Sequence, residues 1–498
     1  MTPAYLIINS MVSQCLRSSF YSNRNLAFIR SKELTSKRTT STTSLYSSAT
    51  QSMDSAVDKS IVATGISAFS PLSLQSSSIN LLKNAVGAGV FSISYKLLGV
   101  SADKFTTLGA IIIIIAMGMW ATYNFWIIGE TCELTNSTSY GEAWSRTVSG
   151  NTEWIVQLVT LLSPVVSCLA NTIVLTDILV MISRSIGGPL WFHGNRNLVI
   201  SLLGTLVLYP LCTRKDLSAL KSVSAFGLLG QLIAMLVLAF RVFDRSYFPG
   251  GRYSPATFSQ VLATVPSGLN PSSAADPFKW FMFASLLSYC FVTHYNAPRF
   301  ALELENKTSG RFLLMAGTSF GLASLVYIGS MLLGISLFGT SVQPFLLNNM
   351  SPLDPLGTLA RVCFASSVLA SYPLIFFNMR NWITSKVNLF YSKYGPKNNA
   401  SPVKSISVGQ VSAALLGAIC FLATKFTDIS FVGSLAGAIF GSNMMFIFPP
   451  LMYIRALQKK AKENNCHINL VTVTANSLLL LAGAALGIIG TYRTLTLR

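Results

Sequence analysis

The segment from 78 to 99, SINLLKNAVGAGVFSISYKLLG, is apolar enough to enter a bilayer, yet Gly87, Ala88 and Gly89 stand in its middle. Glycine disfavours a helix because it loses the most backbone freedom on ordering. A helix that opens at membrane depth exposes N–H and C=O groups, and hydrocarbon offers them no hydrogen bonds. Such a break is tolerated where it faces a cavity inside the protein, and discontinuous helices of this kind hold ligands. The segment therefore predicts a helix that is interrupted at a ligand site.

The rest of the chain predicts further helices that cross a membrane. It has 498 residues, of which 51% are hydrophobic and 11% charged, whereas a soluble domain has roughly 25% charged residues. Apolar stretches of about 20 residues, the length that crosses a hydrocarbon core, recur throughout. We therefore expect an all-α polytopic membrane protein with about eleven transmembrane helices. The expected spans are 79–99, 105–128, 153–183, 197–212, 219–243, 278–298, 311–339, 355–379, 405–423, 429–455 and 468–492.

The formal net charge of +19 would suggest a nucleic-acid partner in a soluble protein. Here most Lys and Arg residues fall in the loops after even-numbered spans and in the N-terminal segment, so we expect no nucleic acid. The positive-inside rule then places the N-terminus in the cytoplasm, with the basic loops near an anionic leaflet of the lipid bilayer. The host membrane is left open among the plasma membrane, a vacuolar or other endomembrane and an organellar membrane.

Residues 1–75 differ in composition from residues 76–498. The first segment is basic and rich in Ser and Thr, a composition typical of a disordered tail. Arg and Lys among serines are also found in organellar transit peptides, so cleavage of the tail stays an alternative. We expect residues 76–498 to form the transmembrane domain.

A second interruption is expected in the sixth span. Its stretch from 288 to 298, SYCFVTHYNAP, brings small and polar residues, His294 and Pro298 into a helix otherwise rich in Phe and Leu. Spans 1 and 6, both broken and five spans apart, suggest a 5+5 inverted repeat with the eleventh span as an addition. In such folds the two breaks meet near the membrane midplane and form the binding site.

Four short motifs, in order along the chain, carry a resemblance to the amino acid/auxin permease family. They are Asn80-Leu81-Leu82 before Gly87-Ala88-Gly89; 290–298 (CFVTHYNAP) with Glu303-Leu304; Arg361 with Tyr372-Pro373; and 431–438 (FVGSLAGA) with Pro449-Pro450. The resemblance covers the chain from about residue 76 onward. It implies a LeuT-like fold and secondary active transport of amino acids, driven by a proton or sodium gradient. It also implies a substrate site at the breaks of spans 1 and 6.

An amino acid presents a carboxylate and an ammonium group to such a site. The N–H groups of Gly87, Ala88 and Gly89, at the start of a half-helix, suit the carboxylate, and main-chain carbonyls at Cys290, Phe291 and Val292 suit the ammonium. The side chains expected to select the substrate are Ala85, Phe91, Asn171, Phe291 and His294. Close helix packing through small residues is the alternative interpretation of the glycines.

Ion coupling is expected at the same level of the membrane. Sodium-coupled members of the resembling family carry an asparagine four residues before the first glycine of this motif. Here Lys83 holds that position and Asn84 follows it. A fixed cation would oppose sodium, so H⁺ is the expected coupling ion, with Na⁺ as the alternative. His294 titrates near neutral pH in water, and Ser367 and Ser371 offer hydroxyls from span 8. Lys83 could instead extend its stem to the inner interface.

The preferred function is thus proton-coupled transport of an amino acid by a monomer without cofactors. The alternatives are a sodium-coupled transporter and an amino acid sensor on a transporter fold that binds without net flux. An enzyme is not expected, because the sequence has no phosphate-binding loop or Gly-x-Ser-x-Gly motif and no catalytic residues are identified. His193, His294 and His467 are too scattered to predict a metal site. The sequence leaves the particular amino acid, the direction and the stoichiometry open.

Overall fold

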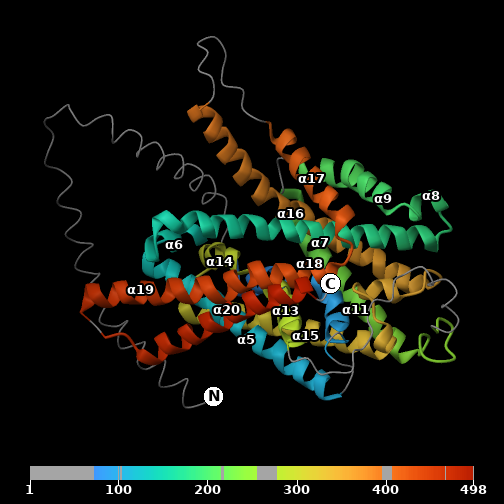
Figure 1. Ribbon diagram of the computed structural model, residues 1–498, viewed down its shortest axis with the longest axis horizontal. Coiled ribbons are helices and arrows are strands. Elements are labelled where there is room, and N and C mark those ends of the chain that lie inside the picture. The colour runs from blue at the N-terminus through green and yellow to red at the C-terminus, as the bar shows by residue number, and fades with distance from the viewer. Residues whose placement is uncertain are drawn as a thin grey trace, which may run out of the picture. The chain divides into compact units, whose positions relative to one another are not determined.

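The structure is a computed structural model that describes residues 72–98, 100, 104–214, 218–254, 278–394, 407–465 and 467–496. The basic N-terminal segment expected at 1–75 lies outside the described residues, apart from its last four positions. Within the described part, every regular element is a helix, and a single isolated β-bridge joins Leu72 to Leu304. The expected all-α class is confirmed (Figure 1).

All eleven expected spans are helical. By length and composition, seven described helices could cross a membrane, and three shorter apolar helices lie in the first, fourth and fifth spans. The sixth span, at 279–303, consists of shorter helices. The spans in chain order are α3 (Leu74–Ala85) with η1 (Ala88–Ser92) and α4 (Ile93–Leu98); α5 (Lys104–Thr135); α7 (Glu153–Ser185); α9 (Arg196–Leu202) with η3 (Leu203–Leu208) and α10 (Tyr209–Cys212); α11 (Ser218–Phe243); α13 (Lys279–Phe291) with η4 (His294–Asn296) and α14 (Ala297–Glu303); α15 (Ser309–Phe338); α16 (Pro355–Tyr394); α17 (Val408–Lys425); α18 (Ile429–Ala436) with η7 (Gly437–Ile447) and α19 (Phe448–Asn464); and α20 (Leu470–Thr496).

Short helices lie between these spans. They are α6 (Tyr140–Thr147), η2 (Gly150–Thr152), α8 (Leu190–His193), η5 (Gly339–Ser341) and η6 (Leu346–Asn349). Because the spans alternate in direction, we call the end of the bundle at which α3 begins the α3 side. The opposite end, at which α16 begins, is the α16 side. The loop with η5 and η6 therefore belongs to the α16 side.

The eighth span is longer than expected: α16 continues to Tyr394 rather than ending near 379. Arg380, expected in a loop, lies inside this helix and is buried. Its guanidinium donates to the main-chain oxygens of Cys212 (2.6 Å) and Arg214 (3.1 Å) at the end of α10. Charged donors at the last carbonyls of a helix satisfy groups that have no partner within that helix.

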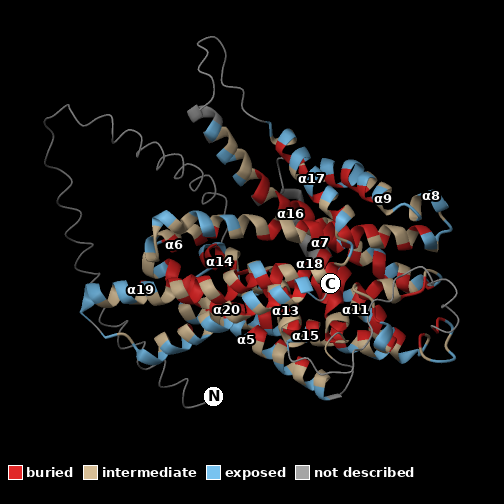
Figure 2. Ribbon diagram, in the orientation of Figure 1, coloured by how far each residue is buried: buried red, intermediate tan, exposed pale blue. Residues whose placement is uncertain are grey.

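Buried residues gather along the inward faces of α7, α13, α15 and α16 (Figure 2). The outward faces carry exposed large apolar side chains, for example Phe105 and Ile488. Apolar residues on the outside of a bundle suit contact with lipid. In the interior, α15 packs against both α3 and α5, and α11 packs along α16. This arrangement places the first span between α15 on one face and α11 and α16 on another.

Candidate functional site

The first span is broken where the glycine motif predicted it. Helix α3 ends at Ala85, and Val86 takes φ −85° and ψ 88°. Gly87 follows in an extended conformation (φ −107°, ψ −162°), and the 3₁₀-helix η1 starts at Ala88. The N–H of Gly87 turns back to the carbonyl of Ala85 (3.1 Å). The first N–H groups of η1, those of Ala88 and Gly89, have no partner within their own helix.

The two glycines of the motif have different surroundings. Gly87 is exposed, and a Cβ built on it would meet no heavy atom within 4 Å, so it borders open space. Gly89 is buried, and a Cβ there would lie 2.8 Å from the Sγ of Cys290 and 3.3 Å from the ring of Tyr289. Gly89 therefore lets the first span approach the sixth at the level of both breaks.

The sixth span is broken as well. Helix α13 ends at Phe291, Val292 is extended (φ −74°, ψ 98°), and the short 3₁₀-helix η4 starts at His294. Helix α14 then continues the span, with Pro298 in its first turn, where the missing N–H costs nothing. The interruption lies within the predicted stretch from 288 to 298.

A tyrosine that the sequence did not single out connects the two breaks. Tyr327, on α15, is fully buried. Its hydroxyl lies 2.7 Å from the main-chain oxygen of Ala85 and 2.8 Å from that of Cys290. The ring of Phe291 packs edge-on against it, with ring centroids 4.8 Å apart. Ala85, Cys290 and Phe291, all predicted as site residues, therefore meet around one hydroxyl group.

Other hydroxyls on α15 follow the first span along its length. Ser319 donates to the carbonyl of Ser78 (3.0 Å), and Ser330 donates to that of Val90 (2.9 Å). In return, Ser94 donates to the carbonyl of Ser330 (3.2 Å). Side-chain hydroxyls of α15 and of the first span thus bond main-chain carbonyls of the facing element on both sides of the break. This row fixes the position of both halves of the broken helix.

Phe91 is closed off from open space. Its ring packs edge-on against Phe364 of α16, with centroids 4.9 Å apart, and against Phe345 of the loop before η6, at 6.2 Å. Phe91 and Phe345 are both almost completely buried. Asn171, the candidate from the third span, is a buried residue of α7, which packs against η1. The loop on the α16 side therefore covers the break from that side.

Lys83 points into the junction of three helices. Its Nζ is buried and has no hydrogen-bond partner. A Cβ built on Gly227 of α11 would be 2.6 Å from this Nζ and 3.3 Å from the hydroxyl oxygen of Ser367 on α16. The stem of Lys83 therefore does not carry its ammonium to water, which was the alternative interpretation.

The remaining ion-coupling candidates lie differently. Asn84 is exposed, and its amide donates back to the carbonyl of Asn80 (2.9 Å). Ser371 donates to the carbonyl of Ser367 (3.0 Å) within its own helix, the common arrangement for a helical serine. Of the two predicted serines, Ser367 is the one beside Lys83.

His294 faces α5 and α15. Its Nε2 lies 3.1 Å from the carbonyl of Ala121, while its Nδ1 is buried without a partner. The ring stacks on Phe320, with centroids 5.8 Å apart and planes at 18°, and meets Phe125 edge-on. Because a carbonyl only accepts, Nε2 carries the hydrogen. The Nε2–H of the imidazole is therefore placed as a donor among aromatic rings.

Buried charges hold the loop on the α16 side. Arg361 is fully buried and donates to the carbonyls of Leu347 and Met350 around η6. The guanidinium of Arg361 is thus satisfied by main-chain oxygens inside the bundle. Asp354, also fully buried, pairs with Arg241 at the end of α11 and accepts a hydrogen bond from the Tyr247 hydroxyl (2.9 Å).

Asp244 extends this pair in the loop after α11. It forms an ion pair with Arg241 and accepts from the main-chain N–H of Ser246 (2.9 Å). Slight burial opposes ionisation, but the hydrogen bonds from Ser246 and Arg241 outweigh it and hold the pKa of Asp244 below its usual value. The α16 side is therefore closed by a connected set of charges.

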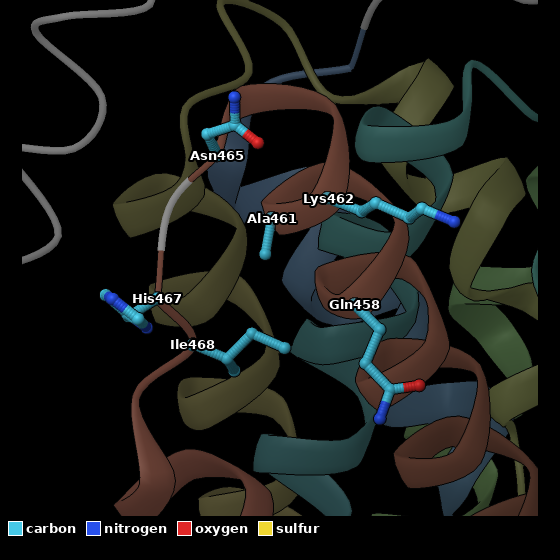
Figure 3. Close-up of a pocket in the computed structure, with 6 residues that line it drawn as sticks. All are labelled: Gln458, Ala461, Lys462, Asn465, His467 and Ile468. Atoms are coloured by element: carbon cyan, nitrogen blue, oxygen red, sulfur yellow. The ribbon is translucent and has the colours of Figure 1, made fainter.

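A cavity of about 510 Å³ lies elsewhere, at the turn between α19 and α20 (Figure 3). Ala461 and Ile468 border it, and Lys462 extends away from it in the view shown. It sits at the C-terminal end of α19, where the helix dipole disfavours a carboxylate. None of the residues that line it is among the predicted substrate-binding residues.

Comparison with known proteins identifies the family of this chain. The model of the transmembrane amino acid transporter protein family matches residues 70–495. Vacuolar amino acid transporter 2 of Saccharomyces cerevisiae is 19% identical over 395 residues, 78% of this chain and 77% of that protein. Sodium-coupled neutral amino acid symporter 2 of Danio rerio is 21% identical over 308 residues, 59% of this chain and 58% of that protein.

Among solved structures, the inward facing conformation of Mhp1 aligns with a TM-score of 0.54 at 13% identity, over 86% of this chain and 90% of that one. At this identity the likeness concerns the fold alone, and it confirms the expected LeuT-like fold. Since the family model covers almost the whole chain, the protein belongs to the transmembrane amino acid transporter family.

Proposed function

We propose that this protein is a proton-coupled secondary active transporter of amino acids, with its substrate site at the breaks of the first and sixth spans. The observation that supports this most is that the two breaks meet. Tyr327 contacts the carbonyls of Ala85 and Cys290, one from each break, and Gly87 next to them borders open space. Transporters of this fold build their substrate sites from unwound main chain of this kind.

The two ends of an amino acid fit the two breaks. The N–H groups of Ala88 and Gly89 start a half-helix, where the positive end of the helix dipole favours a carboxylate. The carbonyls at the end of α13 lie opposite and favour an ammonium. Gly89 keeps the two breaks in contact, so one small molecule can reach both. Of the side chains predicted to select the substrate, Phe291 packs against Tyr327, which contacts both breaks.

Lys83 supports a proton rather than sodium as the coupling ion. Its buried Nζ stands among α3, α11 and α16, next to the hydroxyl of Ser367. A charged ammonium without an acceptor is costly to bury. The protonation of Lys83 is therefore coupled to any movement of the surrounding helices that admits water to its Nζ. As long as Lys83 keeps its proton, a sodium ion would be repelled from the same junction.

The exposure of the first span supports alternating access. Ser76 and Asn84 are exposed and Asn80 is partly exposed, and these three lie on one face of α3. Gly87, just beyond the end of α3, is exposed as well. Polar side chains do not face lipid, so this face borders water from the α3 side up to the break. On the other side Phe91 is covered by Phe345. The conformation is thus open toward the α3 side and closed toward the α16 side.

The α3 side is proposed to be cytoplasmic. Its described loops and helix ends carry Arg146, Lys307, Arg455, Lys459 and Lys462 among other cations. An excess of Lys and Arg in short loops marks the cytoplasmic side. The structure is then an inward-open state.

Uptake into proteoliposomes tests the proposal. Purified protein is reconstituted and given a mixture of labelled amino acids under an imposed pH gradient, with sodium present or replaced by choline. We expect uptake that follows the pH gradient and is indifferent to sodium. Uptake that requires sodium would contradict proton coupling. Saturable binding of an amino acid without uptake, by intact protein, would instead favour the sensor.

A further inference from the structure

The hydroxyl of Tyr327 occupies the point at which carbonyls from both breaks converge. Its oxygen lies 2.7 Å from the oxygen of Ala85 and 2.8 Å from that of Cys290. Both carbonyls belong to residues at the ends of interrupted helices, where no i+4 N–H is available to them. Tyr327 itself is held by the edge-on ring of Phe291 and is fully buried.

Carbonyl oxygens that converge from unwound helices are the ligands with which transporters of this fold coordinate a coupling cation. Oxygen ligands hold a cation the size of Ca²⁺, which is close in radius to Na⁺, at about 2.4 Å. A neutral hydroxyl at 2.7–2.8 Å from the same two oxygens takes the place of a cation by donating its one hydrogen bond to either of them. We propose that Tyr327 stands in the place of an alkali cation between the breaks and is the residue that makes this site independent of sodium.

The hydroxyl also leaves room for the substrate. It has one proton to donate and two carbonyl oxygens within reach, so it donates to one carbonyl at a time. The carbonyl of Ala85 receives a second donor, the N–H of Gly87 at 3.1 Å. The carbonyl of Cys290 is therefore the one with spare accepting capacity. An ammonium group bound between the breaks donates to it, and Tyr327 then donates to Ala85.

The test compares Tyr327→Phe with Tyr372→Phe. Tyr372 is an equally buried tyrosine on α16 whose hydroxyl lies 3.1 Å from that of Thr172. Two measurements are made in sodium or choline chloride at constant ionic strength: the unfolding temperature of the purified protein and the KM of uptake. The KM measurement rests on the proposed transport function. The unfolding temperature does not, so failure of transport leaves the cation question answerable.

In the wild type we expect sodium to change neither quantity. In Tyr327→Phe we expect the KM in choline to rise about tenfold, the factor that corresponds to one buried hydrogen bond of about 1.4 kcal/mol. Added sodium should lower this KM and raise the unfolding temperature saturably, because a cation can enter the vacated position. Tyr372→Phe should leave the KM and the indifference to sodium unchanged.

Three results would overturn the proposal. The first is saturable stabilisation of the wild type by sodium, which also serves as the test if Tyr327→Phe does not fold. The second is a Tyr327→Phe protein with the wild-type KM and no response to sodium. The third is an equal response to sodium in Tyr372→Phe, which would mean that loss of any buried hydroxyl suffices.

Discussion

Lys83 and Gly227 fit together because position 227 has no side chain: a Cβ there would stand 2.6 Å from the lysine Nζ. The two residues belong to α3 and α11, and the same point lies 3.3 Å from the Ser367 hydroxyl of α16. The ammonium is buried without an acceptor. Since burying an unpaired charge is costly, any movement that separates these helices changes the affinity of Lys83 for its proton.

Replacing Lys83 by methionine keeps the length of the side chain and removes the proton site. We expect uptake by Lys83→Met to lose its stimulation by the pH gradient, while exchange of labelled for unlabelled substrate continues. Lys462→Met, at an exposed lysine beside the α19–α20 turn, is the matched control and should respond to the gradient like the wild type. A Lys83→Met protein that still follows the gradient would remove Lys83 from the coupling mechanism.

Gly89 tests the contact between the two breaks. In Gly89→Ala the new methyl group would lie 2.8 Å from the Cys290 Sγ, and overpacking of this kind costs about 1–3 kcal/mol. We expect KM to rise about tenfold or more, because one tenfold step corresponds to 1.4 kcal/mol. Gly321→Ala, on α15, meets nothing within 4 Å and should leave KM unchanged.

A second substitution separates local crowding from a general defect. Removal of the sulfur in Gly89→Ala/Cys290→Ala makes room for the methyl group, so the double variant should recover much of the lost affinity. If the double variant is as poor as Gly89→Ala alone, the close approach of Gly89 to Cys290 is not what the glycine provides.

The two breaks could be predicted from the sequence because each has a local cause. Gly87 and Gly89 weaken the first span, and Thr293, His294 and Pro298 interrupt the sixth. Both breaks lie within the predicted stretches. The low helix preference of a few residues in each span was therefore enough to predict where the main chain leaves the helical conformation.

Tyr327 could not be predicted in this way. A tyrosine within an apolar helix indicates only that its hydroxyl needs a partner. The partners, Ala85 and Cys290, are 242 and 37 residues away and offer main-chain oxygens, which every residue has. For the same reason the end of the eighth span was predicted too early, near 379. Arg380 is satisfied by carbonyls at the end of α10, and no local sequence pattern predicts this contact.

Substitution of Asp354 tests whether the buried ion pairs on the α16 side stabilise the protein. Asp354→Asn leaves the buried guanidinium of Arg241 with Asp244 alone, and breaking a buried pair costs about 3 kcal/mol or more. We expect the unfolding temperature of the purified protein to fall by several degrees. Glu142→Gln, which breaks the half-exposed pair with Arg146, is the control and should cost at most about 1 kcal/mol. Equal effects of the two changes would contradict the structural role of the buried pair.

Substitution of His294 distinguishes between His294 and Lys83 as the residue that carries the coupling proton. Its Nε2 hydrogen is directed at the Ala121 carbonyl and its Nδ1 has no partner among the rings of Phe125 and Phe320. A second proton on this ring would be a buried charge without an acceptor. His294→Gln keeps an N–H donor for Ala121, so we expect a modest loss of stability and an unchanged dependence of uptake on pH. Measured beside Lys83→Met, the pH profile decides between them: a profile that shifts in His294→Gln and not in Lys83→Met would transfer the coupling proton from the lysine to the histidine.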